Sequence, residues 1–101
     1  MPHFVVEYVD GPGSAEIRSL HRPAHIQYRI ELGRALVLAG PLFDDFDGQP
    51  AKGSLVILEA RDKAEATEIA HRDPYVVAGA FAEVRILAHR ILVLNPPRKE
   101  G

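Results

Sequence analysis

Cysteine is absent from the 101 residues of this chain. Without it there is no disulfide framework, no thiolate zinc site and no cysteine nucleophile. Long apolar runs are also missing, since no uninterrupted run approaches the roughly 20 residues that a membrane-spanning helix needs. Residues 1–4 contain no basic segment followed by an apolar stretch, so no signal peptide is evident. We therefore expect a soluble, cytoplasmic protein without a membrane partner.

A basic excess is missing as well. Lysine and arginine number 12 against 14 aspartates and glutamates, which gives a formal net charge of −2. Proteins that hold nucleic acids through their phosphates carry a clear positive excess, so we expect no nucleic-acid partner.

What is present describes an ordinary soluble globule, with 47% hydrophobic and 26% charged residues. A chain of this length buries about two thirds of its surface, which is enough for one core. We predict a single domain over residues 1–95 and a flexible C-terminal tail over residues 96–101.

Short β-branched and aromatic runs, separated by Gly, Pro and Asp, predict four strands. These strands are expected at residues 4–9, 34–39, 54–60 and 81–94, the last one bent near 88–89. The pattern also predicts a helix at 22–32, a loop at 40–53, a helix capped by Asp62 and a helical turn at 75–79. Glu65 stands at the capping-box position of the second helix. That helix should stop before Asp73, because the residue before a proline disfavours the α conformation.

Pro23 sets the predicted start of the first helix. Proline costs about 3 kcal/mol inside a helix but is tolerated in its first turn. We therefore expect the helix to begin near Arg22 and Pro23 and to end before Gly33, with residues 14–21 as a lead-in.

The predicted order β-α-β-β-α-β indicates an α+β, ferredoxin-like domain, a four-stranded antiparallel sheet with both helices on one face. The later strands are apolar on both sides over much of their length. The face without helices therefore needs cover, and we expect a homodimer that packs sheet against sheet. A long loop lying over that face is the alternative.

His25 is the first candidate for chemistry. In the first turn of a helix, the positive end of the helix dipole would favour a neutral imidazole that can act as a base. A boundary histidine that merely caps or fills space is the alternative. Asp73 is the second candidate, because a carboxylate can orient an imidazole and stabilise its charged form. Its alternative is a structural Asp-Pro stop that bonds to nearby backbone.

Metal sites are less well supported by the pattern. His21 and His25 lie four residues apart and would share one side of a continuous helix, but Pro23 stands between them. Asp44, Asp45 and Asp47 lack the register and the closing Glu of a calcium loop, so a solvated turn is expected there. We predict neither a metal nor another cofactor.

Four short motifs resemble those of the YCII-related (YciI-like) family, in its order and spacing. They are Arg22-Pro23-Ala24-His25, Gly40-Pro41, Gly53-Ser54 and Asp73-Pro74-Tyr75-Val76. The resemblance covers nearly the whole chain and implies a dimeric α+β barrel with a pocket that pairs His25 with Asp73. Most members of the family have no assigned reaction, although one branch removes hydrogen chloride from a chlorohydroxyquinol. The long acidic loop after Gly40 and the tail after Leu94 depart from the family pattern and leave the substrate open.

We therefore predict a cofactor-free enzyme that carries out elimination, isomerisation or hydrolysis of a small activated compound. His25 and Asp73 are its predicted catalytic residues. The predicted substrate-binding residues are Arg22, Gly40, Pro41, Ser54 and Tyr75. Three alternatives stay open: a small-molecule binding or sensing dimer without turnover, a structural or interaction domain, and another dimeric barrel group such as the small monooxygenases of antibiotic biosynthesis.

Overall fold

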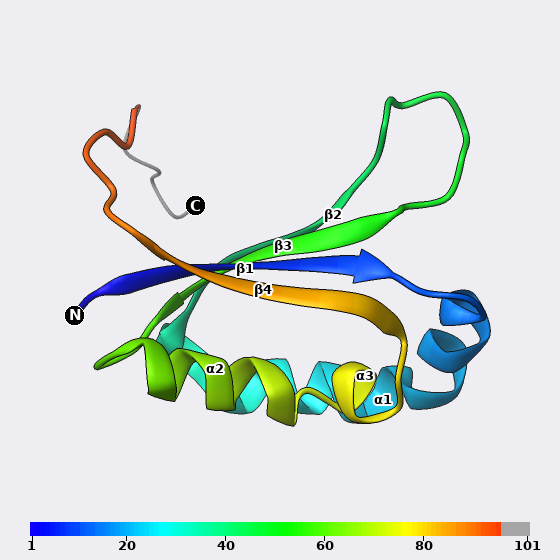
Figure 1. Ribbon diagram of the computed structural model, residues 1–101, viewed down its shortest axis with the longest axis horizontal. Coiled ribbons are helices and arrows are strands. Elements are labelled where there is room, and N and C mark those ends of the chain that lie inside the picture. Colours follow the sequence, from blue (N-terminus) through cyan, green and yellow to red (C-terminus); the bar gives the residue numbers. More distant parts are fainter. Residues whose placement is uncertain (96–101) are drawn as a thin grey trace.

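Four antiparallel strands form one sheet, and the helices cover one of its faces (Figure 1). The computed structural model describes residues 1–95. Its elements are β1 (His3–Asp10), α1 (Ser14–Leu32), the 3-10 helix η1 (Gly33–Ala35), β2 (Leu36–Leu42), β3 (Gly53–Glu59), α2 (Lys63–Arg72), α3 (Pro74–Val77) and β4 (Phe81–His89). The strand order β2-β3-β1-β4 confirms the predicted ferredoxin-like α+β fold. The predicted tail at 96–101 lies outside the described residues.

Alternation along the two central strands builds the core. On β1, Val6 and Tyr8 point to the helices, and on β3 Val56 and Leu58 do the same. Ala70 of α2 packs against this cluster, where a small side chain lets the helix approach the sheet closely. The apolar residues of the two central strands therefore fix which face the helices cover.

The first helix is longer than predicted. α1 begins at Ser14, so the start expected near Arg22 and Pro23 is wrong. Pro23 lies inside the helix and cannot donate a hydrogen bond to the carbonyl of Ser19, four residues earlier. Its ring is exposed, while Ser14 before it and His25 after it are buried. Packing on both sides of Pro23 thus outweighs the local cost of the proline, and residues 14–21 are helix.

The last strand is shorter than predicted, because it loses its partner. β4 ends at His89, which pairs with His3, the first residue of β1. Beyond this pair no backbone of β1 remains for a ladder, and residues 90–95 are not strand. The strand predicted to continue to Leu94 therefore stops five residues earlier. β2 lies later in the chain than predicted. The first residues of the predicted strand, 34–35, belong to η1, and the strand continues to Leu42.

The second helix begins and ends as predicted. The Asp62 carboxylate accepts a 2.8 Å hydrogen bond from the Glu65 amide. Glu65 in turn accepts from the amide of Arg61, the residue before the cap, and this hydrogen bond lowers the pKa of its carboxyl. Capping therefore fixes the start of α2, and its end at Arg72 fixes where Asp73 stands.

The face of the sheet opposite the helices has an apolar row across all four strands. Leu38, Ile57, Val5 and Leu87 share one row of the register on this face, where the central Ile57 is only 9% exposed. Leu38 is 48% exposed and Leu87 43%. In Figure 1 the β2–β3 loop and the segment after β4 rise on this side, at opposite ends of the sheet. Within residues 1–95, none of the helices is long and apolar enough to span a membrane.

Candidate active site

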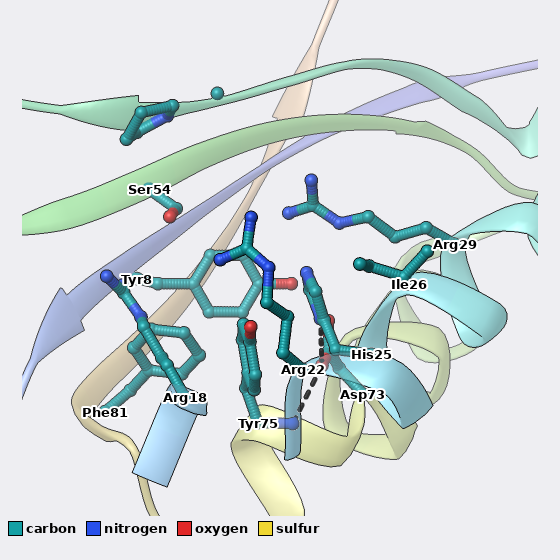
Figure 2. A pocket seen from close by; sticks show the side chains of 12 residues that line it. Tyr8, Arg18, Arg22, His25, Ile26, Arg29, Ser54, Asp73, Tyr75 and Phe81 are labelled. Atoms are coloured by element: carbon teal, nitrogen blue, oxygen red, sulfur yellow. Dashed lines mark hydrogen bonds and ion pairs between the residues drawn. The ribbon is translucent and has the colours of Figure 1, made fainter. Parts of the chain in front are cut away.

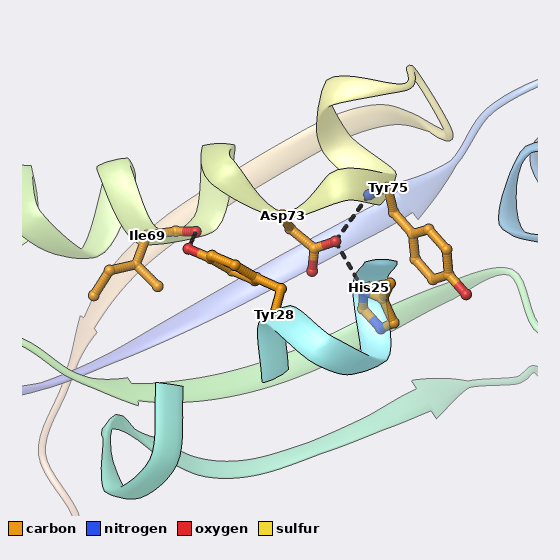
Figure 3. A network of polar contacts seen from close by, with 5 residues as sticks. All are labelled: His25, Tyr28, Ile69, Asp73 and Tyr75. Carbon is orange, nitrogen blue, oxygen red and sulfur yellow. Dashed lines mark hydrogen bonds and ion pairs between the residues drawn. The ribbon is translucent and has the colours of Figure 1, made fainter. Parts of the chain in front are cut away.

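His25 and Asp73 meet although they are 48 positions apart in the chain. A 2.8 Å hydrogen bond joins Nδ1 of His25 to Oδ1 of Asp73 (Figure 3). Both residues are only 7% exposed. The same carboxylate oxygen accepts a second hydrogen bond, 2.9 Å long, from the backbone N–H of Tyr75. Two donors therefore hold the Asp73 carboxylate in one position.

The local sequence explains why Asp73 stands there. Pro74 pushes the residue before it out of the α conformation, so Asp73 separates α2 from α3. Its extended backbone lets the side chain cap α3 through the Tyr75 amide, and Pro74 occupies the first position of α3, where proline is favoured. The structural role expected of an Asp-Pro stop and the contact with His25 are thus combined in one carboxylate.

This contact decides which nitrogen of His25 is available. An ionised carboxylate can only accept hydrogen bonds. Nδ1 of His25 therefore carries a proton and donates a hydrogen bond to Asp73. The lone pair of the neutral ring is then on Nε2, which Figure 2 shows on the side away from Asp73, facing the cavity. The Tyr75 ring stacks on the imidazole with 3.8 Å between centroids and 9° between planes. The ring is therefore fixed in both tautomer and orientation.

The predicted effect of the helix dipole on His25 is wrong. His25 lies well inside α1 and not in its first turn, because the helix begins at Ser14. The helix dipole acts within the first and last turns, so it does not set the charge of this imidazole. Contact with Asp73 and stacking on Tyr75 take its place as the local influences on the ring.

A cavity of about 250 Å³ opens beside this pair, between α1 and the sheet. Every predicted site residue lines it: Arg22, His25, Gly40, Pro41, Ser54, Asp73 and Tyr75. Gly53, in the same motif as Ser54, acts differently. A Cβ on Gly53 would stand 2.2 Å from the Tyr8 carbonyl oxygen, so Gly53 allows β3 to lie close to β1.

Five further lining residues escaped the sequence analysis. They are Tyr8, Arg18, Ile26, Arg29 and Phe81. A signal for the arginines existed, since Arg18, Arg22 and Arg29 follow the helical spacing of four and seven residues. Arg22 and Arg29 lie within the helix predicted at 22–32, whereas Arg18 joins them only if one helix continues through Pro23. The wrong start for the helix therefore hid Arg18, whereas Arg22 was predicted as a binding residue and Arg29 was overlooked inside the predicted helix.

Arg18 is held by groups on two sides. Its guanidinium makes a 2.5 Å ion pair with Asp10, and its central carbon lies 5.4 Å from the centroid of the Phe81 ring. Its Nε atom is buried and has no hydrogen-bond partner among residues 1–95. Arg18 thus forms one fixed wall of the cavity.

Tyr8 brings a hydroxyl to the cavity from β1. Burial, and then the nearby Asp73 carboxylate, raise the pKa of Tyr8 well above its ordinary value of 10.0. The side chain is therefore a neutral group that can donate a hydrogen bond at physiological pH.

The residues considered as metal ligands lie in different parts of the fold. His21 is exposed and lines a different hollow with Arg72 and Pro74, whereas His25 faces the cavity. In the described part of the chain, no three His, Asp or Glu side chains are grouped so as to hold a metal ion. The acidic residues of the β2–β3 loop are exposed, and two of them bond to their own backbone turn, Asp45 to Phe46 and Asp47 to Gln49.

Comparison with known proteins gives a family and a set of related folds. The family described as the YCII-related domain matches residues 1–90. A search of curated proteins gives no match. A solved structure of 5-chloro-2-hydroxyhydroquinone dehydrochlorinase from Burkholderia phenoliruptrix AC1100, in complex with 2,5-dihydroxybenzoquinone, is 27% identical with a TM-score of 0.77. The similarity covers 87% of this chain and 93% of that one.

More distant structures share the fold alone. An antibiotic biosynthesis monooxygenase is 10% identical over 92% of this chain and 100% of its own, with a TM-score of 0.53. A dimeric ferredoxin-like protein of unknown function from Jannaschia sp. CCS1 is 15% identical, covers 90% of this chain and 100% of its own, and has a TM-score of 0.50.

Proposed function

Because this chain belongs to the YCII-related domain family, we propose that it is a small-molecule enzyme that works by acid–base chemistry at His25. The observation that carries the proposal is the buried 2.8 Å contact between His25 and Asp73 beside a cavity. Nε2 of His25 accepts a proton from the substrate and returns it to product or solvent. Asp73 acts through His25 as a positioning residue, and Arg22, Gly40, Pro41, Ser54 and Tyr75 hold the substrate.

The reaction we propose is elimination, isomerisation or hydrolysis of an already activated compound. Proton transfer by a positioned side chain contributes typically about 10²–10⁴-fold to a rate, which suits such substrates. The similar dehydrochlorinase makes elimination the first reaction to test. In such an elimination, His25 would take a proton from the substrate while chloride leaves with the electron pair of the carbon–chlorine bond. The net loss is hydrogen chloride.

The test measures chloride release and quinone formation from 5-chloro-2-hydroxyhydroquinone. We expect turnover by the wild-type protein and a loss of about 10²–10⁴-fold in His25→Ala. His21→Ala is the matched control, since it removes an exposed histidine of the same helix outside the cavity. Equal rates in wild type and His25→Ala would exclude the proposed role of His25. Saturable binding with the compound recovered unchanged would favour a binding module instead.

We also propose that two copies of this chain pack through their open sheet faces. The support is the apolar row of Leu38, Ile57, Val5 and Leu87, which spans four strands and has no helix over it. In a two-fold symmetric dimer the same surface patch of each subunit forms the interface. The apolar row can therefore be buried against the same row of a second copy.

A further inference from the structure

Three arginines of α1 face the cavity together. Arg18, Arg22 and Arg29, which we call the arginine row, all line it beside His25. Figure 2 shows their guanidinium groups extending from the helix towards the strands. The spacing of four and seven residues places the three side chains on one side of the helix. The arginine row therefore belongs to the lining of the cavity, with Arg22 exposed at its edge and Arg18 and Arg29 half-buried.

Carboxylates among residues 1–95 neutralise only part of this row. Among residues 1–95, Asp73 is the one acidic residue that lines the cavity, and its Oδ1 already accepts from His25 and Tyr75. Asp10 pairs with Arg18. Within residues 1–95, neither Arg22 nor Arg29 forms an ion pair. With Asp10 counted against Arg18, the site carries three arginines and two aspartates, a formal charge of +1 with His25 neutral, in a chain whose net charge is −2.

The other polar groups of the cavity agree with this charge. The hydroxyls of Tyr8 and Ser54 can donate hydrogen bonds, and each guanidinium presents several N–H groups. A ligand that matches them must offer acceptors. A guanidinium group binds a planar pair of oxygens, such as those of a carboxylate, through two parallel hydrogen bonds. The volume of about 250 Å³ suits a compound no larger than a small ring with substituents.

We propose that the substrate of this site is a small, planar organic anion, with carboxylate, phenolate or enolate oxygens bound by Arg22 and Arg29. The proposal names the substrate class of the enzyme proposed above and rests on that function. It adds a role during the reaction. When Nε2 of His25 takes a proton, the electron pair stays on the substrate as an oxyanion, and fixed positive charge beside it stabilises that state.

Binding, measured by calorimetry at low salt, tests the charge requirement without needing turnover. Two matched pairs of compounds serve as probes. The first is 2,5-dihydroxybenzoquinone, ionised at neutral pH, against its uncharged dimethoxy counterpart; the second is benzoate against benzamide. We expect the anion of at least one pair to bind at least about 10-fold more tightly than its neutral partner, and its affinity to fall as salt is added.

The variants Arg22→Gln and Arg29→Gln locate the effect. Each should weaken binding of the anion about 10-fold and leave the neutral probe unchanged. Arg34→Gln, at an exposed arginine outside the cavity, should bind as the wild type does. Melting temperatures of all variants show that they are folded. The inference is overturned if no anion binds better than its neutral partner, or if Arg34→Gln weakens binding as much as the other two.

The two proposals can fail separately. Selective binding of anions without any turnover would retain the arginine row as a recognition element and remove the enzyme. Turnover that depends on His25, together with binding that ignores charge, would retain the enzyme and remove this inference.

Discussion

The ring of Tyr75 lies flat on the imidazole of His25, with 3.8 Å between the two centroids. The backbone N–H of Tyr75 donates to the same Asp73 oxygen that contacts His25. One residue therefore supports the histidine from its face and, through Asp73, from its edge.

Tyr75→Ala should destabilise the protein by about 3 kcal/mol, because a buried aromatic ring is removed and a cavity remains. Tyr75→Phe keeps the stacked ring and should cost much less. Urea denaturation at fixed protein concentration measures both. Equal destabilisation by Phe and Ala would show that the hydroxyl, and not the stacked ring, carries the stability of Tyr75.

Asp73 has two roles that substitutions can separate. Asp73→Asn can still cap α3 but loses the charged acceptor for His25, whereas Asp73→Ala loses both. We expect a loss of about 1.5–3 kcal/mol for the charged hydrogen bond and about 1 kcal/mol more for the cap. A double-mutant cycle with His25→Ala should give a coupling energy of about 0.5–3 kcal/mol. Additive effects would mean that the pair contributes nothing as a pair.

Gly53→Ala should destabilise the sheet. Its Cβ would stand 2.2 Å from the Tyr8 carbonyl oxygen, a backbone atom that cannot move independently. Forced separation of the two strands should cost about 1–3 kcal/mol. Gly40→Ala is the control, since a Cβ there meets no atom within 4 Å, and it should change stability by less than about 0.5 kcal/mol. Thermal melting distinguishes the two variants, and similar losses for both would contradict the steric explanation.

Alkaline pH should weaken the folded state through two tyrosines. Burial, and then the Asp73 carboxylate, raise the pKa values of Tyr8 and Tyr28 above 10.0 in the folded protein. The folded state therefore holds these protons more tightly, so this stability is present below about pH 10 and is lost as pH rises further. Tyrosinate absorbance should develop at higher pH in the folded protein than in urea. Tyr8→Phe should reduce the alkaline loss of stability, and identical titrations in both states would contradict the prediction.

A charge on the open sheet face should prevent association. Leu38→Glu and Leu87→Glu each place a carboxylate at one end of the apolar row, on the outer strands β2 and β4, and should convert a dimer to a monomer. Val77→Glu is the control, because Val77 is 74% exposed on the helical side. Light scattering after gel filtration gives the masses. A monomeric wild type, or a dimer that survives both leucine variants, would exclude this interface.

The order of the elements was predictable because the strands, the loop and the cap of α2 leave local signals. Asp62 and Glu65 mark the start of α2 by their spacing, and the structure shows the expected bond between them. Ends that depend on distant partners were not predictable. β4 stops at His89 because β1 begins at His3, and nothing near His89 in the sequence records where β1 begins.

The candidate site was predictable only in part. The seven residues predicted for the site line the cavity, yet the contact between His25 and Asp73 rests on packing between distant segments. Arg18 was missed because Pro23 was expected to start the helix, and the tertiary contacts that keep residues 14–21 helical have no local signal. Arg29 was missed although it follows the predicted Arg22 by seven residues in the same helix. Tyr8 was missed because a tyrosine near the end of a strand has no pattern that separates a core residue from a cavity wall.

All four strands, together with α1 and α3, contribute at least one wall of the cavity. No smaller folding unit of the chain can assemble it. A compound that occupies the cavity is therefore linked to folding of the whole domain. At a concentration 100 times its dissociation constant it would add about 2.7 kcal/mol to the free energy of unfolding. The cellular lifetime of the chain would then depend on the supply of that compound, since proteases act on the unfolded fraction.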